Sequence, residues 1–157
     1  MRAGTIALAA SALLLAATAA SAGGHHAAAA SDYSGVIKGR QAGMRMSNAL
    51  VGGMKAALER GDDVKTQSSA ARALAAWAAA IPGMFPEGSN TAPSEALPAV
   101  WSDWAGFKGK ADAYAAATGK LAAAAAAGDK PGFVAALGEV GAGCGGCHDG
   151  FKAAGHH

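Results

Sequence analysis

Strand-forming patterns are absent from this 157-residue chain, which has no run of alternating β-branched residues. Alanine dominates the composition instead, and alanine has the highest helix propensity of all residues. Because periodic alternation is the main signal for strands, its absence predicts an all-α protein.

Neither sign of charge is in large excess. The formal net charge is +2, and it would fall to +1 if Arg2 were removed with the first 22 residues. Nucleic-acid binding usually needs a concentrated basic face. The near-neutral charge therefore predicts that nucleic acid is not a partner.

No apolar run is long enough to span a membrane. The run IALAASALLLAATAA follows the basic Arg2 and ends in the small residues ASA, and these are the three parts of a secretory signal peptide. A membrane anchor would need a longer run and flanking stop-transfer charges. We therefore predict a signal peptide at 1–22 that is cleaved after Ala22, export to the periplasm, and no membrane span in the mature form.

The rest of the chain suits one domain. Cleavage would leave 157 − 22 = 135 residues. Residues 23–31 (GGHHAAAAS) are predicted to form a flexible leader and residues 155–157 a tail, with the domain at 32–154. Four of the five histidines lie in these two ends, which leaves His148 as the only histidine of the domain.

Proline is nearly confined to one place, because four of the five prolines lie in the segment 81–98. That segment is predicted to be a long loop. Stop and start signals for helices also occur in ERGDD at 59–63 and in AAGDKPG at 126–132. These breaks predict helices at 32–60, 63–80, 98–127 and 130–153.

Three of these helices have an inward stripe with alternating steps of three and four residues. In the helix at 98–127 the stripe consists of Val100, Trp104, Phe107, Ala111, Tyr114, Thr118 and Leu121. This spacing is typical of helices packed in a bundle. Short turns join the first helix to the second and the third to the fourth. The fold class is therefore predicted as an antiparallel up-down-up-down four-helix bundle.

Both cysteines lie within four positions, in the C-terminal stretch GAGCGGCHDGFK. Cys144, Cys147 and His148 form the C-x-x-C-H signature of c-type haem attachment. On a helix these three positions share one face, so two thiols can bond to one porphyrin while the imidazole reaches its iron. We predict one covalent haem c, with His148 as the proximal iron ligand.

Two other interpretations of the cysteines are weaker. A disulfide redox site of the thioredoxin type would need a βαβ context, which this chain lacks. A zinc site would need four ligands, and only three lie close together in the sequence. With no second histidine in the domain, no catalytic constellation is visible, and no enzymatic activity is predicted.

The sequence resembles the class II cytochromes c, which include cytochrome c′ and its low-spin Met/His-ligated relatives. GRQAGM at 39–44 is similar to the R-Q-x-x-[L/M/F] pattern of that family's first helix. ALPAVWSDWAGF at 96–107 is similar to the start of its third helix, and CHDGFK to its C-H-x-x-[FY]-[RK] ending. The resemblance covers about residues 33–153 and implies a bundle that encloses the haem.

The resemblance also implies roles for three residues of the first helix. Arg40 and Gln41 would lie near the haem propionates, and Met44 would face the distal side of the iron. If Met44 ligates iron, the protein is a low-spin electron carrier of the periplasm that serves redox partner proteins. If Met44 only packs there, the haem is five-coordinate and binds NO or CO. The first function is the prediction and the second is its alternative.

Two further expectations concern the other methionines and the oligomeric state. Met46 and Met54 are predicted to be surface or packing residues rather than ligands. Members of the family often form homodimers through their first two helices. The small residues on the second helix would allow such close approach.

Overall fold

The computed structural model describes residues 32–154, and the predicted signal peptide, leader and tail lie outside them. Four long helices account for most of this part of the chain: α1 (Ser34–Arg60), α2 (Ser68–Ala80), α4 (Trp104–Ala127) and α5 (Lys130–Phe151). The short elements are η1 (Val64–Gln67), η2 (Pro82–Met84) and α3 (Ala99–Ser102). Within residues 32–154 the only β-structure is an isolated bridge between Ala96 and Lys152. The all-α prediction is confirmed.

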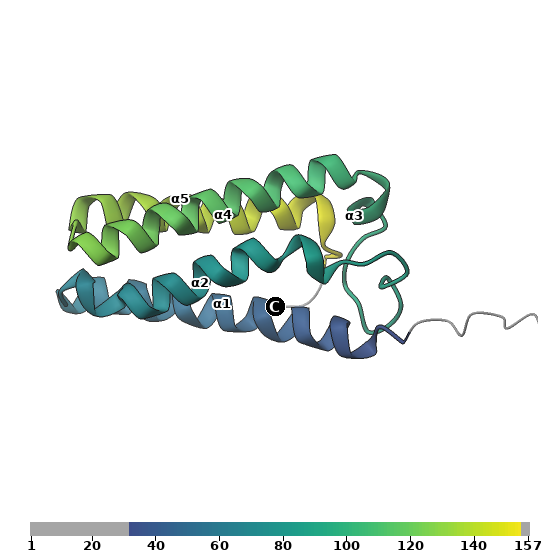
Figure 1. Cartoon of the computed structure of the whole chain (residues 1–157), viewed down its shortest axis with the longest axis horizontal. Helices are drawn as coiled ribbons and strands as arrows, with labels where there is room; N and C mark the ends of the chain where they lie inside the picture. The colour runs from purple at the N-terminus through teal and green to yellow at the C-terminus, as the bar shows by residue number, and fades with distance from the viewer. Residues whose placement is uncertain (1–31, 155–157) are drawn as a thin grey trace, which may run out of the picture. The chain divides into compact units, whose positions relative to one another are not determined.

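The long helices form two antiparallel pairs. Figure 1 shows α1 beside α2 and α4 beside α5, and α2 packs along α4. The start of α1, the end of α5, the 81–98 loop and α3 all lie at the same end of the bundle (Figure 1). The predicted four-helix bundle is confirmed, and its topology brings the two motifs singled out above to one end.

Two helix–helix turns follow the predicted stop and start signals. Gly61 and Gly128 end α1 and α4 in the left-handed conformation, with φ of 78° and 74°. Glycine adopts this conformation without the steric penalty that other residues would incur. Asp129 then caps α5, because its carboxylate accepts a hydrogen bond from Gly132 N at 3.0 Å. Asp63 caps η1 in the same way.

The structure differs from the predicted helices at three places. The helix predicted at 98–127 is interrupted at Asp103, where φ is −122° and ψ is 58°. The Asp103 carboxylate accepts a hydrogen bond from Gly106 N at 3.0 Å, so this residue ends α3 and starts α4. The second predicted helix begins with the 3₁₀ turn η1. The last helix ends at Phe151 because Lys152 is extended.

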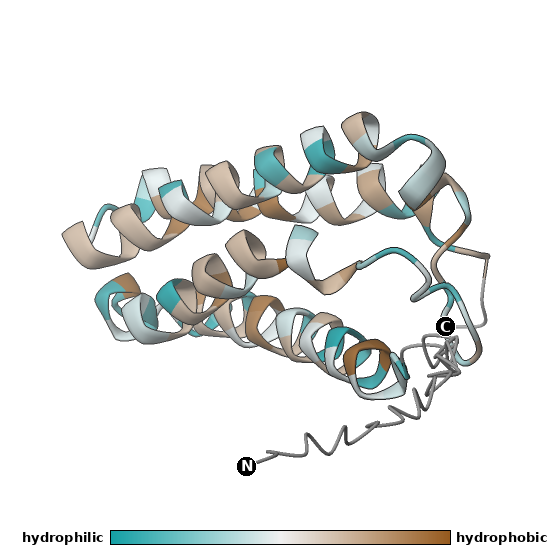
Figure 2. Cartoon of the chain, turned by 45° about the vertical axis from the view of Figure 1, so that its right-hand side comes forward, coloured by the Kyte–Doolittle hydropathy of each residue, from teal (hydrophilic) through white to brown (hydrophobic). Residues whose placement is uncertain are grey.

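The predicted inward stripes form most of the core. All seven residues predicted for the stripe of 98–127 are buried except Trp104, which is 40% exposed. The prediction that Trp104 points inward like the rest of the stripe was therefore wrong. Figure 2 shows hydrophobic and hydrophilic residues alternating along the long helices. Among the described residues, no helix is both long and apolar enough to cross a bilayer.

Gly43 is required by a close approach between α1 and α2. It is buried in α1, and a Cβ atom at this position would overlap the six-membered ring of Trp77. We expect Gly43→Ala to lower the free energy of unfolding by about 1–3 kcal/mol, because the core would have to shift. Urea unfolding of the haem-loaded protein measures this value.

Gly53→Ala on the same helix is the matched control for Gly43→Ala. Gly53 is exposed, and a Cβ atom there would meet nothing within 4 Å. This substitution should raise the free energy of unfolding by about 0.5–1 kcal/mol, because alanine loses less conformational entropy than glycine in a helix. Equal effects at the two positions would contradict the close packing of Trp77 on α1.

Candidate cofactor site

The C-x-x-C-H residues lie on the last turns of α5. Cys144 and Cys147 are partly buried and pack against the hydrophobic core, as does Phe151 one turn further on. His148 follows on the same helix and has an exposed side chain. Both cysteines are free thiols. The structure therefore presents two thiols and an imidazole from one stretch of helix.

Burial raises the pKa of both the Cys144 and the Cys147 thiol above the usual value for cysteine. Redox and nucleophilic chemistry at cysteine needs the thiolate, which a raised pKa disfavours. The surroundings of the thiols thus do not favour the thiol-redox interpretation. Within residues 32–154, no three His, Cys, Asp or Glu side chains are grouped to hold a metal ion, so the zinc interpretation gains no support there.

Tyr114 of α4 connects α1 with α5. Its phenol lies close enough to Cys144 of α5 and to Ser47 of α1 to interact electrostatically with both. Burial raises the pKa of the Tyr114 phenol far above its usual range, so the hydroxyl stays neutral. The Ser47 hydroxyl also donates to Gly43 O at 2.8 Å. The turn of α1 from Gly43 to Ser47 is therefore brought next to the first cysteine of the motif.

Met44 lies in that turn of α1, where it is partly buried and packs against the core. Met54 is fully buried in the core and Met46 is 61% exposed, as predicted for packing and surface residues. Met84 of η2 is a methionine that sequence reasoning missed: it is partly buried, and its Cε lies 3.5 Å from where a Cβ on Gly39 would be. It lies in a loop, so no helical periodicity pointed to it.

Arg40 is buried at 3% exposure and holds the 81–98 loop. Its Nη1 donates to Met84 O at 3.2 Å and to Ser89 Oγ at 2.7 Å. Its Nη2 donates to Ser89 O and to Ser94 Oγ, both at 2.6 Å. The guanidinium carbon lies 4.4 Å from the centre of the Phe85 ring, in the geometry of a cation–π contact. Burial lowers the pKa of Arg40 from its usual value.

These contacts give Arg40 a role that sequence reasoning did not find. The neighbouring Gln41 also contacts the loop, because its Nε2 donates to Pro93 O at 2.8 Å. The predicted contacts of both residues with haem propionates stay predictions. The Arg-Gln pair of α1 fixes the loop in place.

The same loop is attached to the end of α5. Leu97 N donates to Phe151 O at 3.0 Å, and Ala153 N donates to Glu95 O at 2.8 Å. The Lys152 ammonium group forms an ion pair with the Glu95 carboxylate at 3.3 Å. One loop therefore links the Arg-Gln segment of α1 to the helix that holds the C-x-x-C-H motif.

The residues present fit a haem group. Trp77 Nε1 is buried without a hydrogen-bond partner among residues 32–154, although an unpaired buried N–H is costly. The Trp77 ring lies on Gly43, next to Met44, so this donor is near the turn that faces Cys144. A bound group with acceptor atoms could satisfy the indole. The two half-buried thiols of α5 could hold its porphyrin.

Comparisons with known proteins agree with this arrangement. The family described as Cytochrome C' matches residues 35–152. Cytochrome c-556 of Agrobacterium tumefaciens is 33% identical over 122 residues, which are 76% of this chain and 98% of that relative.

Two solved structures extend the likeness to the fold. Cytochrome c' from Rubrivivax gelatinosus has a TM-score of 0.69 and 37% identity, covering 74% of this chain and 94% of that one. The nitric oxide complex of a mutant of cytochrome c prime from Alcaligenes xylosoxidans has a TM-score of 0.72 and 30% identity, and the match covers 78% of this chain and 97% of that one. Relatives in this family bind haem c covalently, so the predicted cofactor is confirmed at the level of the family. The chain belongs to the class II cytochrome c family.

Proposed function

We propose that this protein is an electron carrier of the periplasm, in which Cys144 and Cys147 hold haem c, His148 is the proximal iron ligand and Met44 is the distal ligand. Haem c supplies a one-electron iron couple when it is bound. The protein supplies the two attachment points, the two axial side chains and the packing that keeps them in place.

The position of Tyr114 between α5 and α1 carries this proposal. Its phenol interacts with both Cys144 and Ser47, and Ser47 lies one helical turn after Met44 on α1. The Met44 thioether therefore lies on the helical segment that faces the attachment helix. A thioether is a soft ligand of the kind found in low-spin cytochromes c.

The loop contacts support the same function. Arg40 and Gln41 fix the loop to α1, and Glu95 and Lys152 help to fix it to α5. A site held from both sides keeps its ligand geometry when the iron changes charge, which favours electron transfer. The periplasmic location, the redox partner proteins and a homodimer through α1 and α2 remain proposals that go with this function.

A second candidate function is binding of NO or CO by a five-coordinate haem. It is favoured by one of the solved relatives, a mutant cytochrome c prime that was solved as its nitric oxide complex. In that case Met44 would pack over the iron without ligating it, since methionine fills irregular apolar spaces well.

Substitution of Met44 separates the two functions. In the haem-loaded wild type we expect a low-spin optical spectrum with a methionine-to-iron charge-transfer band. Met44→Leu should abolish that band, convert the spectrum fully to high-spin and allow rapid CO binding, because leucine keeps the volume but offers no ligand. Absorption spectroscopy and CO mixing measure these changes.

Met84→Leu is the control, because Met84 is the other half-buried methionine near the start of α1. It should leave the low-spin spectrum unchanged. A wild type that is already high-spin and binds CO rapidly would establish the gas-binding function instead. Loss of the charge-transfer band in Met84→Leu rather than in Met44→Leu would identify Met84 as the distal ligand.

A further inference from the structure

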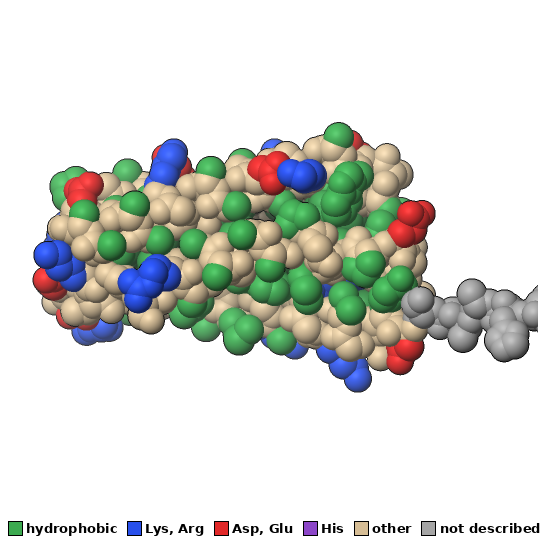
Figure 3. Space-filling view, in the orientation of Figure 1, with side chains coloured by type: hydrophobic (Ala, Val, Ile, Leu, Met, Phe, Trp, Pro, Cys, Tyr) green, Lys and Arg blue, Asp and Glu red, His purple; other side chains and the backbone are tan. Residues whose placement is uncertain are grey.

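A groove lined by aromatic residues and proline lies at the end of the bundle that holds α3. Its volume is about 410 Å³. The residues that line this aromatic groove include Pro82, Phe85, Pro86, Glu87, Trp101 and Trp104. Figure 3 shows hydrophobic side chains gathered at the same end. Exposed apolar surface of this kind marks interaction sites on soluble proteins.

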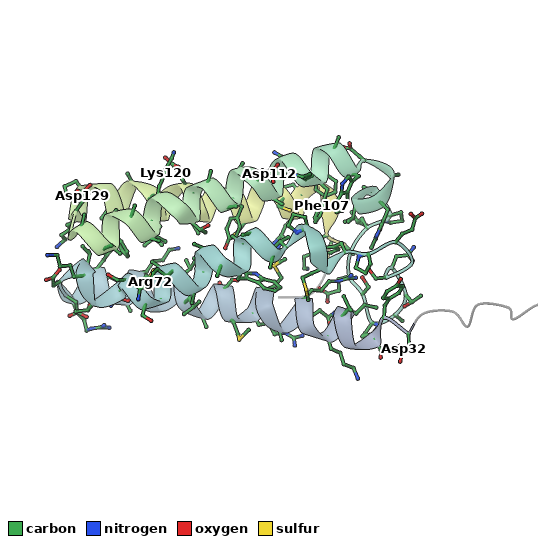
Figure 4. The ribbon with its side chains drawn as sticks, viewed as in Figure 1. Asp32, Arg72, Phe107, Asp112, Lys120 and Asp129 are labelled. Carbon is green, nitrogen blue, oxygen red and sulfur yellow. The ribbon has the colours of Figure 1, made fainter. Side chains whose placement is uncertain are left out.

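Trp104 connects the groove to the attachment helix. Its ring centre lies 5.4 Å from that of Phe107, and the Phe107 ring lies 5.4 Å from that of Phe151. Figure 4 labels Phe107 on α4, beside the end of α5. Phe151 follows His148 by three residues on α5. A continuous set of aromatic contacts therefore runs from the turn after the predicted proximal ligand to the exposed face of Trp104.

The floor of the aromatic groove is held by fixed contacts. Trp101 Nε1 donates to Phe85 O and to Pro86 O, at 3.1 Å in each case. The Phe85 ring packs edge-on against Phe107 at 4.9 Å and lies over the Arg40 guanidinium. A surface that is already ordered loses little conformational entropy when a partner binds.

The chain around the groove is acidic. The segment 73–107 has no lysine or arginine and contains Glu87, Asp103 and Glu95, of which Glu95 is paired with Lys152. Glu87 lines the aromatic groove, and Asp103 is exposed next to Trp104. One exposed carboxylate therefore lines the groove, and a second, which caps α4, adjoins Trp104.

Two basic side chains near this face, Lys108 and Arg40, are engaged elsewhere. The Lys108 ammonium group, one turn after Trp104, forms an ion pair with Asp112 at 2.7 Å. Arg40 is buried beneath the Phe85 ring and donates to the loop. An approaching partner thus meets an apolar centre with an anionic rim, which complements an apolar patch surrounded by basic residues.

We propose that the aromatic groove docks a basic one-electron redox protein, and that Trp104 provides the contact nearest to the haem-bearing helix. This inference rests on the proposed electron-carrier function and names the class of its partner. One electron passes from the reduced protein to the partner's acceptor, whose oxidation state falls by one. Electron transfer slows steeply with distance through protein, so docking at the end of the Phe151–Phe107–Trp104 contacts would favour it.

Small oxidants of opposite charge test this docking site. Tris(1,10-phenanthroline)cobalt(III) is aromatic and cationic, whereas ferricyanide is anionic. Stopped-flow mixing with the reduced, haem-loaded protein gives a second-order rate constant for each. We expect Trp104→Ala to slow oxidation by the cobalt complex about tenfold, because an aromatic anchor is lost. Oxidation by ferricyanide should change less than about twofold.

Glu87→Lys and Val134→Ala complete the set of variants. Glu87 is exposed, so its reversal of charge should leave the fold intact and slow the cobalt reaction about three- to tenfold at low salt. Val134 is 50% exposed on the first turns of α5, at the other end of the bundle, and its substitution should change neither rate. Equal effects on both oxidants, or no effect in both groove variants, would overturn the docking site.

A binding measurement separates this inference from the proposed function. The cobalt complex cannot oxidise the already oxidised protein, so NMR titration reports contact alone. The Trp104 indole signal should shift more than that of Trp77, whose Nε1 is buried and whose ring packs on Gly43. A shift at Trp104 in a high-spin protein would keep the docking site while removing the low-spin electron carrier. Absence of that shift in a low-spin protein would remove the docking site while keeping the electron carrier.

Discussion

Replacement of both Cys144 and Cys147 by alanine is expected to abolish covalent haem attachment completely. The two thiols are the only cysteine sulfurs in the chain, so no other side chain can form a thioether to the porphyrin. The protein should be produced in a host that exports it and attaches c-type haem. Extraction with acidified acetone should leave all haem on the wild type and none on the double variant.

Gly141→Ala is the matched control for the double cysteine variant. It lies on the same helix one turn before Cys144, and a Cβ atom there would meet nothing within 4 Å. This control should retain its haem through extraction, which separates loss of the thiols from damage to α5. Haem that stays bound to the denatured double variant would show that another residue makes the bond.

Arg40→Ala should lower the free energy of unfolding by about 3–5 kcal/mol. The Arg40 side chain makes four hydrogen bonds to the loop, two of them to Ser89, which is fully buried. Alanine would leave the Ser89 hydroxyl and carbonyl without these donors, at about 1–3 kcal/mol for each buried group. It would also remove the cation–π contact with Phe85. Urea unfolding of the haem-loaded protein measures the loss.

Arg40→Lys tests whether the planar guanidinium group matters as well as the positive charge. Lysine keeps the positive charge but cannot donate in two directions to Ser89 and Ser94, so we expect an intermediate loss of stability. The reduction potential gives an independent readout of the predicted propionate contact. A large change of potential with little change of stability in Arg40→Ala would favour the propionate over the loop as its main partner.

Most helix ends were predictable because residues close in the sequence determine where a helix stops. Gly61 and Gly128 end helices through their own backbone freedom, and Asp129 caps α5 through a residue three positions away. The break at Asp103 was missed because the residues around it continue the apolar spacing of a helix. The backbone angles of Asp103 and its capping bond to Gly106 N show that the helix is interrupted there.

The candidate site was predictable in part for the same reason. Cys144, Cys147 and His148 are close in the chain, so helical geometry alone puts them together. Arg40 was noticed through the family resemblance, but its partners in this chain were not. Its acceptors at Ser89 and Ser94 are 49 and 54 residues away, in a loop without periodicity.

The sequence by itself determined the helices, their inward faces and the attachment motif, because propensity, capping and spacing act within a few residues. Only the tertiary structure decided which groups meet across the bundle. It placed Ser47, Tyr114 and Cys144 together, and it left Trp104 exposed over Phe107 although its spacing placed it inside. The physical reason is that these contacts depend on how the loop and the four helices share one limited core, which no local pattern encodes.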